Sequence, residues 1–233
     1  MDERLRALAD EWELPPEAAV QLRSVLEAVE TEPTSITTVR DPVEAVDVHV
    51  ADSLSGLAVG WLRSAERIAD LGSGGGFPGL ALAAALPGAT VTLVESVGKK
   101  CAFLDRAATA AGLANVLVVN ARAEEWRDGL GTQDIVTARA LAPLSVLVEY
   151  AAPLLHVGGA LIAWKAGRDD EEERDGLAAA TALGMEPRDV ASVAPFDGSG
   201  ARHLYPYLKV RETPLGYPRR AGMARKRPIR AST

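Results

Sequence analysis

The stretch from Arg67 to Gly79 constrains the fold of this chain more than any other. A short apolar run ends at Asp70, a glycine-rich turn follows, and Pro78 opens an alanine- and leucine-rich run over 80–86. The turn holds Gly72, Gly74, Gly75 and Gly76. Glycine accepts positive φ and lets a ligand approach bare backbone, and proline suits the first turn of a helix. The pattern therefore predicts a strand, a tight loop and a helix whose free N–H groups face a nucleotide-type ligand.

Two kinds of cofactor site share this loop pattern. Gly74, Gly76 and Gly79 fit the G-x-G-x-x-G spacing of a dinucleotide site. Asp70 and the glycines at 72, 74 and 76 fit the D-x-G-x-G-x-G loop of S-adenosylmethionine methyltransferases. A carboxylate beside the loop would repel a pyrophosphate and attract the cationic amino group of S-adenosylmethionine. Asp70 therefore favours S-adenosylmethionine over a dinucleotide, and four glycines between a predicted strand and helix, with acids after both strands, argue against an ordinary flexible turn.

A second acid follows the next predicted strand. Residues 90–95 form an apolar run that ends at Glu95. A carboxylate at this point accepts hydrogen bonds from both ribose hydroxyls in either cofactor family. Glu95 therefore indicates an adenosine site without choosing between the two cofactors.

The chain from 66 to 185 alternates apolar runs with helical patterns. The predicted strands lie at 67–70, 90–95, 116–119, 134–138, 159–164, 189–193 and 203–210, and helices at 80–86, 98–111, 143–155 and 177–183 lie between them. Such alternation implies a mostly parallel sheet with helices on both faces. We therefore predict a Rossmann-like α/β fold with seven strands. In it, 116–119 is buried and the last two strands pair, with Pro206 at an edge or a bulge.

Helical spacing also marks the N-terminal part. Residues 1–31 predict two helices, and Asp41 is placed to cap a third. On that third helix His49, Asp52 and Ser53 lie three and four positions apart and share one face. Spacing alone favours a histidine that is merely hydrogen-bonded to Asp52 over a polar cluster that lines a site, and both interpretations stay open.

Charge separates the C-terminal end from the rest of the chain. The net charge is −7, yet the segment 211–233 holds seven basic residues and one acid. Such a basic tail is the electrostatic footprint of a phosphate-backbone partner, although a frayed, solvated terminus has the same composition. We predict three parts: a helical extension at 1–62, a core domain at 63–210 and an RNA-contacting segment at 211–233.

Cysteine usage and hydropathy indicate the compartment. Cys101 is the only cysteine, so no internal disulfide can form and a reducing compartment is expected. The chain opens with no basic-then-apolar leader, and no apolar run approaches the roughly 20 residues that a membrane span needs. We expect a cytoplasmic protein without a membrane contact.

Several longer motifs occur together along the chain. They are Asp41-Pro42-x-Glu44, His49-x-x-Asp52-Ser53-Leu54, the 70–79 loop, Glu95-Ser96-x-Gly98-Lys99-Lys100, Arg122-Ala123-Glu124-Glu125, Thr137-Ala138-Arg139-Ala140, and Tyr217-Pro218-Arg219-Arg220 with Lys226-Arg227-Pro228. Over nearly its whole length the chain resembles the bacterial glucose-inhibited division protein B family, the small-subunit ribosomal RNA guanine-N7 methyltransferases. Val48 departs from the pattern, since the family usually has a basic residue there.

The resemblance implies a class I S-adenosylmethionine-dependent methyltransferase that modifies N7 of a guanine in the decoding-region loop of 16S ribosomal RNA. The residues that it implies for cofactor binding are Asp70, Gly72, Gly74, Gly76, Phe77, Glu95, Ser96, Val97, Ala123, Glu124 and Arg139. Residues 95–97 would lie along the ribose and 123–124 by the adenine, with Arg139 near the methyl donor. The residues that it implies for RNA contact are His49, Lys165, Arg219, Arg220 and Lys226.

The implied chemistry needs no catalytic acid or base. Guanine N7 carries a free lone pair at neutral pH, so its attack on the sulfonium methyl releases no proton. Orientation and desolvation can supply roughly 7–11 kcal/mol of the barrier, and we expect His49 and Arg139 to position the reactants. We expect no metal, and a monomer that acts on 16S ribosomal RNA or a small-subunit precursor. Two alternatives stay open: a methyltransferase for small molecules or proteins, and a dinucleotide-binding Rossmann protein.

Overall fold

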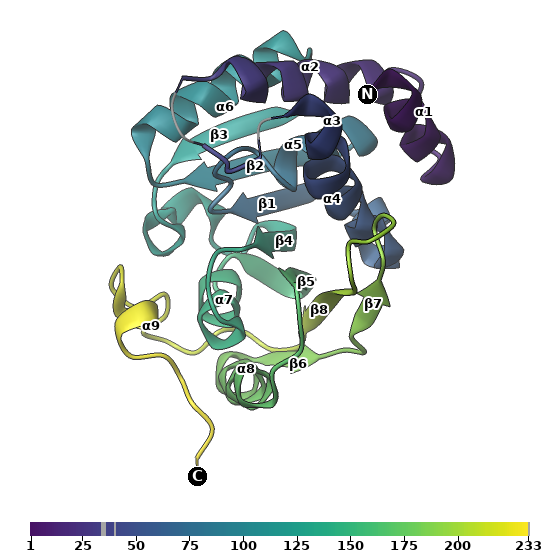
Figure 1. The fold of residues 1–233 in the computed structure, drawn as a ribbon. Coiled ribbons are helices and arrows are strands. Elements are labelled where there is room, and N and C mark those ends of the chain that lie inside the picture. Colours follow the sequence, from purple (N-terminus) through teal and green to yellow (C-terminus); the bar gives the residue numbers. More distant parts are fainter. Residues whose placement is uncertain (34–35, 40, 233) are drawn as a thin grey trace.

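A mixed β-sheet runs through the centre of the chain, with helices on both faces (Figure 1). The computed structural model describes residues 1–33, 36–39 and 41–232. The strands of the described chain are β1 (Arg67–Leu71), β2 (Thr90–Glu95), β3 (Val116–Asn120), β4 (Gln133–Arg139), β5 (Leu155–Lys165), β6 (Met185–Pro187), β7 (Ala191–Val193) and β8 (Arg202–Lys209). The predicted segments 1–62 and 211–233 include positions 34, 35, 40 and 233, which lie outside the described residues.

The sheet order confirms the predicted Rossmann-like class. The strands run β3-β2-β1-β4-β5-β8-β6, and β7 pairs with β8 beside that path. The first five pair in parallel, whereas β8 is antiparallel to β5, β6 and β7. The chain order reverses between β1 and β4, and ligands of such sheets bind at the carboxyl ends of the strands beside that switch point.

Helices cover both faces of the sheet. They are α1 (Asp2–Glu11), α2 (Ala18–Thr31), α3 (Pro42–Ala45), α4 (Asp52–Leu54), α5 (Gly79–Ala85), α6 (Gly98–Ala110), α7 (Leu144–Ala151), α8 (Asp170–Leu183) and α9 (Met223–Lys226). A π-helical turn over Val46–Ala51 joins α3 to α4. Asp41 caps α3 as predicted, because its carboxylate accepts from the N–H groups of Val43 and Glu44, both at 3.0 Å.

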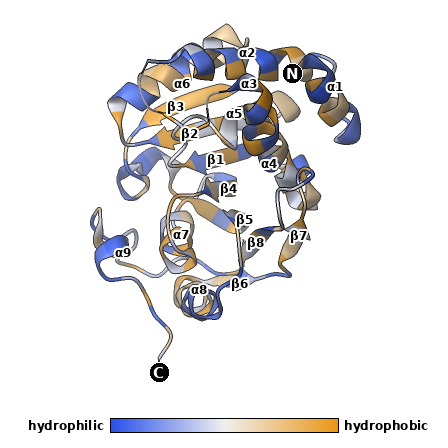
Figure 2. Cartoon of the chain, viewed as in Figure 1, coloured by the Kyte–Doolittle hydropathy of each residue, from blue (hydrophilic) through white to orange (hydrophobic). Residues whose placement is uncertain are grey.

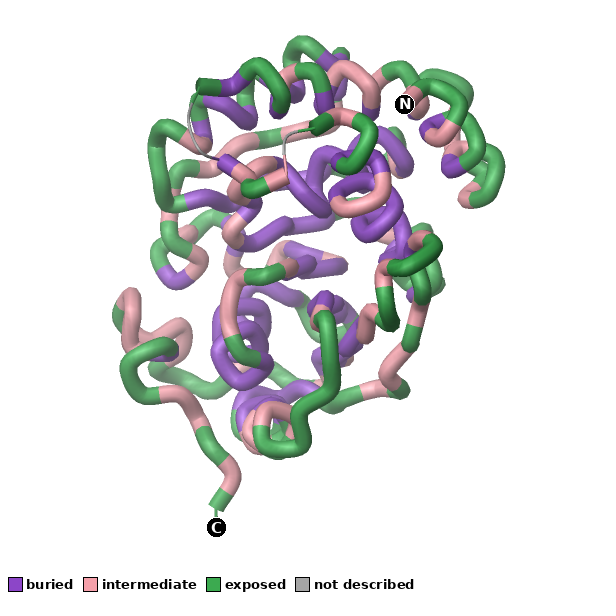
Figure 3. The backbone as a smooth tube through the Cα atoms, in the orientation of Figure 1, coloured by how far each residue is buried: buried purple, intermediate pink, exposed green. Residues whose placement is uncertain are grey.

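Alternation along the strands divides the interior into two hydrophobic clusters. In β1, Ile68 packs with the cluster that contains α2, α5 and α6, whereas Ala69 and Leu71 pack with the cluster that contains α7 and α8. Successive side chains of a strand point to opposite faces, so a parallel sheet covered on both sides is apolar throughout. The central strands are accordingly hydrophobic in Figure 2 and buried in Figure 3.

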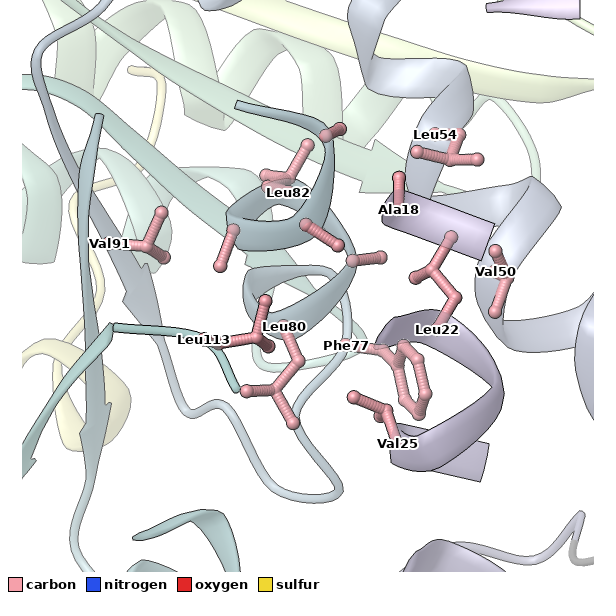
Figure 4. Packing of buried hydrophobic residues seen from close by; sticks show 14 of the residues in the cluster. Ala18, Leu22, Val25, Val50, Leu54, Phe77, Leu80, Leu82, Val91 and Leu113 are labelled. Carbon is pink, nitrogen blue, oxygen red and sulfur yellow. The ribbon is translucent and has the colours of Figure 1, made fainter. Parts of the chain in front are cut away.

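The N-terminal helices share one core with the sheet. Leu22 and Val25 of α2 lie opposite Phe77 and Leu80, at the start of α5 (Figure 4). All four residues are at most 7% exposed, so the extension is packed on the core rather than tethered to it. Among the described residues, no helix is both long and apolar enough to span a bilayer.

The structure corrects three details of the predicted sheet. Over the described residues the sheet has eight strands rather than seven, because the three-residue β6 follows α8. The strand β3 is half exposed rather than buried, since it forms the edge of the sheet. The helix predicted at 143–155 ends at Ala151, and β5 already begins at Leu155. Short strands and boundaries depend on pairing partners that are distant in sequence.

The prediction that the last two strands pair is correct for β7 and β8. Pro206 lies in β8 opposite Ile162 of β5, at the point where the outer partner strand is interrupted between β6 and β7. Its carbonyl accepts from the Arg188 N–H at 2.8 Å. Proline has no N–H to donate to a neighbouring strand, and this proline lies where the outer strand is interrupted.

Candidate active site

The glycines of the loop after β1 adopt backbone conformations that few other residues adopt. Gly72, Gly74 and Gly76 have φ values of +66°, +54° and +93°, in the left-handed region that residues with a Cβ rarely adopt. A Cβ on Gly72 would also lie 2.5 Å from Leu141 Cδ1, and one on Gly76 would lie 2.3 Å from Leu80 Cδ1. The loop is therefore as tight as predicted, and neighbouring side chains fill the space at two of its positions.

Asp70 lies beneath this loop and is 1% exposed. Its Oδ1 accepts a hydrogen bond from the Thr137 hydroxyl at 2.9 Å, and its Oδ2 accepts from the Gly79 N–H at 3.3 Å. Burial raises the pKa of the carboxyl to about 6, against hydrogen bonds that lower it. The direct contact that we predicted with the cofactor's amino group does not follow from this placement, because both oxygens already join β1 to β4 and α5.

Glu95 braces the loop from the end of β2. Its Oε2 accepts from the Gly74 N–H at 3.0 Å, and its Oε1 accepts from the Val97 N–H at 2.8 Å. A carboxylate has about four acceptor sites on its two oxygens, so Glu95 keeps capacity for ribose hydroxyls. The neighbouring Ser96 lines a cavity, and Val97 is 47% exposed. The three predicted ribose residues therefore lie together at one edge of the loop.

Two cavities adjoin the loop, and Gly72 lines both of them. The larger has a volume of about 550 Å³ and the smaller about 280 Å³. Residues that line the larger cavity include Thr37, His49, Asp52, Gly74, Phe77, Lys100, Arg139, Lys165 and Arg202. Residues that line the smaller cavity include Leu71, Val94, Ser96, Ala123, Glu124, Leu141, Tyr150 and Arg225. Most of the predicted site residues thus gather at the carboxyl ends of the strands.

His49 lies in the wall of the larger cavity. Its ring stacks on Phe77 with centroids 4.8 Å apart and planes inclined by 16°. Its Nε2 lies 2.9 Å from the Thr37 hydroxyl and 3.1 Å from the Val39 carbonyl. Burial, followed by the positive charge of Arg139, lowers the pKa of the imidazole. A neutral histidine therefore faces the cavity, bonded to Thr37 and Val39 rather than to Asp52.

Asp52 joins two arginines that also line the larger cavity. Its Oδ2 accepts from Arg139 Nη1 at 2.6 Å, and its Oδ1 accepts from Arg202 Nε at 2.9 Å. Arg139 also donates to the Val48 carbonyl at 3.2 Å, and its guanidinium lies 5.9 Å from the centre of the Phe77 ring. His49 and Asp52 of the predicted polar cluster therefore line the site, whereas Ser53 is buried and its hydroxyl donates to the His49 carbonyl. The site also includes Arg202, which we did not predict.

The position of Arg202 follows from sheet topology. It begins β8, which runs antiparallel to β5, so the start of β8 lies at the edge where the parallel strands end. No motif surrounds Arg202 in the sequence. Only the expectation that the last long strand returns beside 159–164 could have indicated that its first residue reaches the carboxyl edge.

Lys165 also lies in the wall of the larger cavity. Its Nζ lies 2.5 Å from Glu172 Oε1 and donates to the Ala142 carbonyl at 2.9 Å. Lys100, the second lysine of the Lys99-Lys100 pair in the sequence motif, lines the same cavity. The cationic residues of this cavity thus come from β4, β5, β8 and α6, and Asp52 is the acid among its described lining residues.

The basic residues of the C-terminal segment differ in their surroundings. Arg219 donates from Nε to Glu149 Oε1 at 2.6 Å and also pairs with Oε2 of that buried carboxylate. Arg220 and Lys226 are exposed. The internal pairing of Arg219 does not support its predicted contact with RNA, whereas the positions of Arg220 and Lys226 are compatible with one.

The residues around the loop fit S-adenosylmethionine. A Cβ on Gly74 would meet only the Gly72 carbonyl among the described atoms, at 3.6 Å, so this glycine keeps an open space above the loop. The larger cavity has cations that suit the carboxylate of the cofactor, and the smaller has apolar side chains and Glu124, which suit its adenine. Cavities of several hundred cubic ångströms are typical of ligand sites. This fold and this site define a class I S-adenosylmethionine-dependent methyltransferase.

Sequence comparison assigns the family. The model of the GidB family, described as rRNA small subunit methyltransferase G, matches residues 19–205. The protein of that name from Rubrobacter xylanophilus is 45% identical over 82% of this chain and 76% of its own length, and the one from Symbiobacterium thermophilum is 39% identical over 98% and 96%. This chain belongs to the GidB family of methyltransferases and is an enzyme.

Solved structures share the fold. A mutant of MtNAS in complex with S-adenosylmethionine is 19% identical and matches with a TM-score of 0.56, over 82% of this chain and 72% of that one. A structure described as a predicted O-methyltransferase from Agrobacterium tumefaciens is 25% identical, with a TM-score of 0.51 over 72% of this chain and 84% of that one. At 19% identity, the likeness to MtNAS shows a shared fold and nothing more. The described residues contain no group of three His, Cys, Asp or Glu side chains arranged for a metal ion.

Proposed function

We propose that this enzyme transfers the methyl group of S-adenosylmethionine to N7 of a guanine in the decoding-region loop of 16S ribosomal RNA. One observation carries the proposal. The larger cavity is bounded by the glycine loop, where a cofactor fits, and by Lys100, Arg139, Lys165 and Arg202. A methyl donor and a polyanionic acceptor would therefore meet in a single space whose cations favour phosphate.

The chemistry matches the groups that line the cavity. When bound, S-adenosylmethionine supplies a methyl group on a positively charged sulfur. The lone pair of guanine N7 forms the new N–C bond while the S–C bond breaks and its electron pair stays on sulfur. No proton leaves, so the protein has to align N7 with the methyl group and exclude water rather than abstract a proton.

The described groups near this space are suited to positioning. Burial and Arg139 lower the pKa of His49, which favours the uncharged ring, and the reaction releases no proton for that ring to accept. Both oxygens of Asp52 accept from arginines. We therefore propose that His49, Asp52 and Arg139 hold the cofactor and the base in place, with no residue acting as a catalytic acid or base.

We propose the following roles around the cofactor. The backbone of 72–76 and the ring of Phe77 hold its methionine part, and 95–97 hold the ribose. Ala123 and Glu124 lie against the adenine. Asp70 acts through the loop, since its carboxylate holds the Gly79 N–H and not the cavity wall. For RNA, Lys165 acts inside the cavity and the exposed Arg220 and Lys226 act outside it.

We also propose that the protein acts as a monomer in the cytoplasm, on 16S ribosomal RNA or an assembling small subunit. A single chain supplies both the loop and the cations of the larger cavity, so no second subunit is required to complete the site.

Methyl transfer to purified RNA tests the proposal. The protein is incubated with isotopically labelled S-adenosylmethionine and either small-subunit or large-subunit ribosomal RNA, followed by nuclease digestion and mass spectrometry. We expect labelled 7-methylguanosine from one fragment of the small-subunit RNA and none from the large-subunit control. Label on another atom, or transfer only to small molecules or proteins, would refute the proposal. Transfer only to assembled subunits would restrict the substrate to the particle.

A further inference from the structure

The basic C-terminal segment, residues 211–232, reaches the smaller cavity beside the glycine loop. In Figure 1 its helix α9 lies next to α7, on the side of the sheet where the parallel strands end. Glu124 and Arg225 both line this cavity, although 101 positions separate them in the sequence. The segment therefore contributes a wall to the space proposed above for the adenosine part of the cofactor.

Three polar contacts hold the segment there. The Gly222 N–H donates to Glu124 Oε1 at 2.8 Å. The Arg225 guanidinium donates from Nη2 to the Leu141 carbonyl at 2.9 Å. Arg219 forms its paired contact with Glu149 of α7, which is 2% exposed. Each contact joins the segment to a residue of the cofactor cavity or to the buried Glu149, which precedes the cavity residue Tyr150 in α7.

Leu141 connects Arg225 to the glycine loop. The Leu141 side chain packs so closely on Gly72 that a Cβ there would lie 2.5 Å from Leu141 Cδ1. Gly72 and Leu141 both line the smaller cavity. Arg225 therefore fixes the backbone of a residue that rests on the loop, in addition to lining the cavity itself.

The other side of the segment is a cationic surface. Apart from Arg225, which lines the cavity, the exposed basic residues of the segment are Arg211, Arg220, Lys226, Arg227 and Arg230, and the segment holds seven basic residues against one acid. Clustered cations of this kind bind phosphate backbones. One short segment thus combines a cofactor-facing side with a surface suited to RNA.

We propose that Arg225 is a positioning residue for the cofactor, and that the C-terminal segment couples cofactor binding to ribosomal RNA binding. RNA held on Lys226 and its exposed neighbours stabilises the segment against Glu124 and Leu141, which closes the adenosine end of the site. Because binding free energies are linked, each ligand then raises the affinity for the other by the same factor. The RNA half of this inference rests on the proposed function, whereas the role of Arg225 in cofactor binding does not.

Calorimetry with S-adenosylhomocysteine in the absence of RNA tests the cofactor half. Replacing Arg225→Ala removes a charged hydrogen bond and a wall residue, so the dissociation constant is expected to rise about 10-fold. Arg225→Lys, which keeps the charge, restores the affinity to within about 3-fold of wild type. Arg188→Ala, at a surface arginine that pairs with Glu186 and lines neither cavity, is the control and changes the affinity less than about 2-fold. Equal affinities for wild type and Arg225→Ala would overturn the role of Arg225.

The same titration at saturating small-subunit ribosomal RNA transcript tests the coupling. Wild-type protein is expected to bind S-adenosylhomocysteine about 5-fold more tightly with the transcript than without it, a factor typical of linked sites. Arg225→Ala loses this increase while its unfolding temperature without ligand stays that of wild type. An increase that Arg225→Ala retains, or none in the wild type, would refute the coupling. A protein that shows the Arg225 effect without RNA but methylates no RNA would refute the proposed function alone.

Discussion

The two cavities beside Gly72 differ in the chemical groups that line them. The smaller is lined mainly by apolar side chains, Ser96 and the carboxylate of Glu124, with Arg122 and Arg225 beside them. The larger is lined by cations from four different elements, and Asp52 is bonded to two of them. The glycine loop is the wall that they share.

This difference separates recognition of the adenosine part of the cofactor from recognition of the acceptor. A nucleoside is held by shape and by a few directed hydrogen bonds, which depend on a fixed backbone. A polyanion is held by charge, which depends on the number of cations and on salt. Substitutions in the glycine loop, beside either cavity and beneath the loop should therefore have different effects on cofactor affinity, RNA binding and stability.

The largest effect is expected at the shared wall. Gly72→Ala would place a Cβ 2.5 Å from Leu141 Cδ1 at a backbone with φ +66°, so the loop must move. We expect S-adenosylhomocysteine affinity, measured by calorimetry, to fall by about 100-fold or more, with RNA affinity changed far less. Gly88→Ala is the control, since a Cβ there meets no described heavy atom within 4 Å. Unchanged cofactor affinity in Gly72→Ala would contradict a shared wall.

Behind the smaller cavity, Arg219→Ala is expected to cost stability. It leaves Glu149, which is 2% exposed, without its charged partner. Unfolding by urea should show a loss of about 3 kcal/mol, whereas Lys226→Ala should stay within about 0.5 kcal/mol of wild type. A loss below about 1 kcal/mol would mean that Arg219 is free for RNA, as its sequence motif predicted.

Asp70 lies beneath the wall, and its effect should depend on pH. Burial raises its pKa to about 6 in the folded protein, above the value of 3.8 for an unperturbed aspartate. The folded state therefore binds this proton more tightly, and the contribution of Asp70 to stability falls as pH rises from about 4 to about 6. Relative to wild type, Asp70→Asn should gain about 2–3 kcal/mol of unfolding free energy between pH 4 and pH 7. A difference that is constant with pH would show that Asp70 titrates normally.

The smallest effect is expected on the cationic side alone. Arg202→Ala removes one of the two arginines bonded to Asp52 but leaves the glycine loop intact. We expect KM for ribosomal RNA to rise about 10-fold while S-adenosylhomocysteine affinity changes less than about 2-fold. Arg188→Ala, a surface arginine paired with Glu186, is the control. Equal losses of binding for ribosomal RNA and for S-adenosylhomocysteine would contradict the distinction between the two cavities.

Local chemistry explains which parts the sequence predicts well. The strand, loop and helix around Gly72 and the cap at Asp41 depend on neighbours in sequence, and both are present. The positions of Glu95, Ala123 and Arg139 follow from parallel strands that end at one edge. These features need only periodicity, turn residues and the rule for ligand sites in α/β sheets.

The remaining features depend on contacts that are distant in sequence. Arg202 reaches the site because β8 returns antiparallel to β5. Arg219 is internal because Glu149 lies buried on α7, and a basic motif cannot reveal that partner. Asp70 points beneath the loop toward Thr137 rather than into the cavity. Composition and spacing fix neither the direction of a side chain nor the element that packs against it.

A crystal structure of the protein with S-adenosylhomocysteine would test the central claim most directly. We predict the adenine and ribose in the smaller cavity, against Ser96 and Glu124, and the amino-acid part in the larger cavity above Gly74. The sulfur should lie between the two, on the side of Arg139. A ligand bound away from residues 72–76, or a dinucleotide that binds there in preference with its pyrophosphate across the loop, would contradict the account.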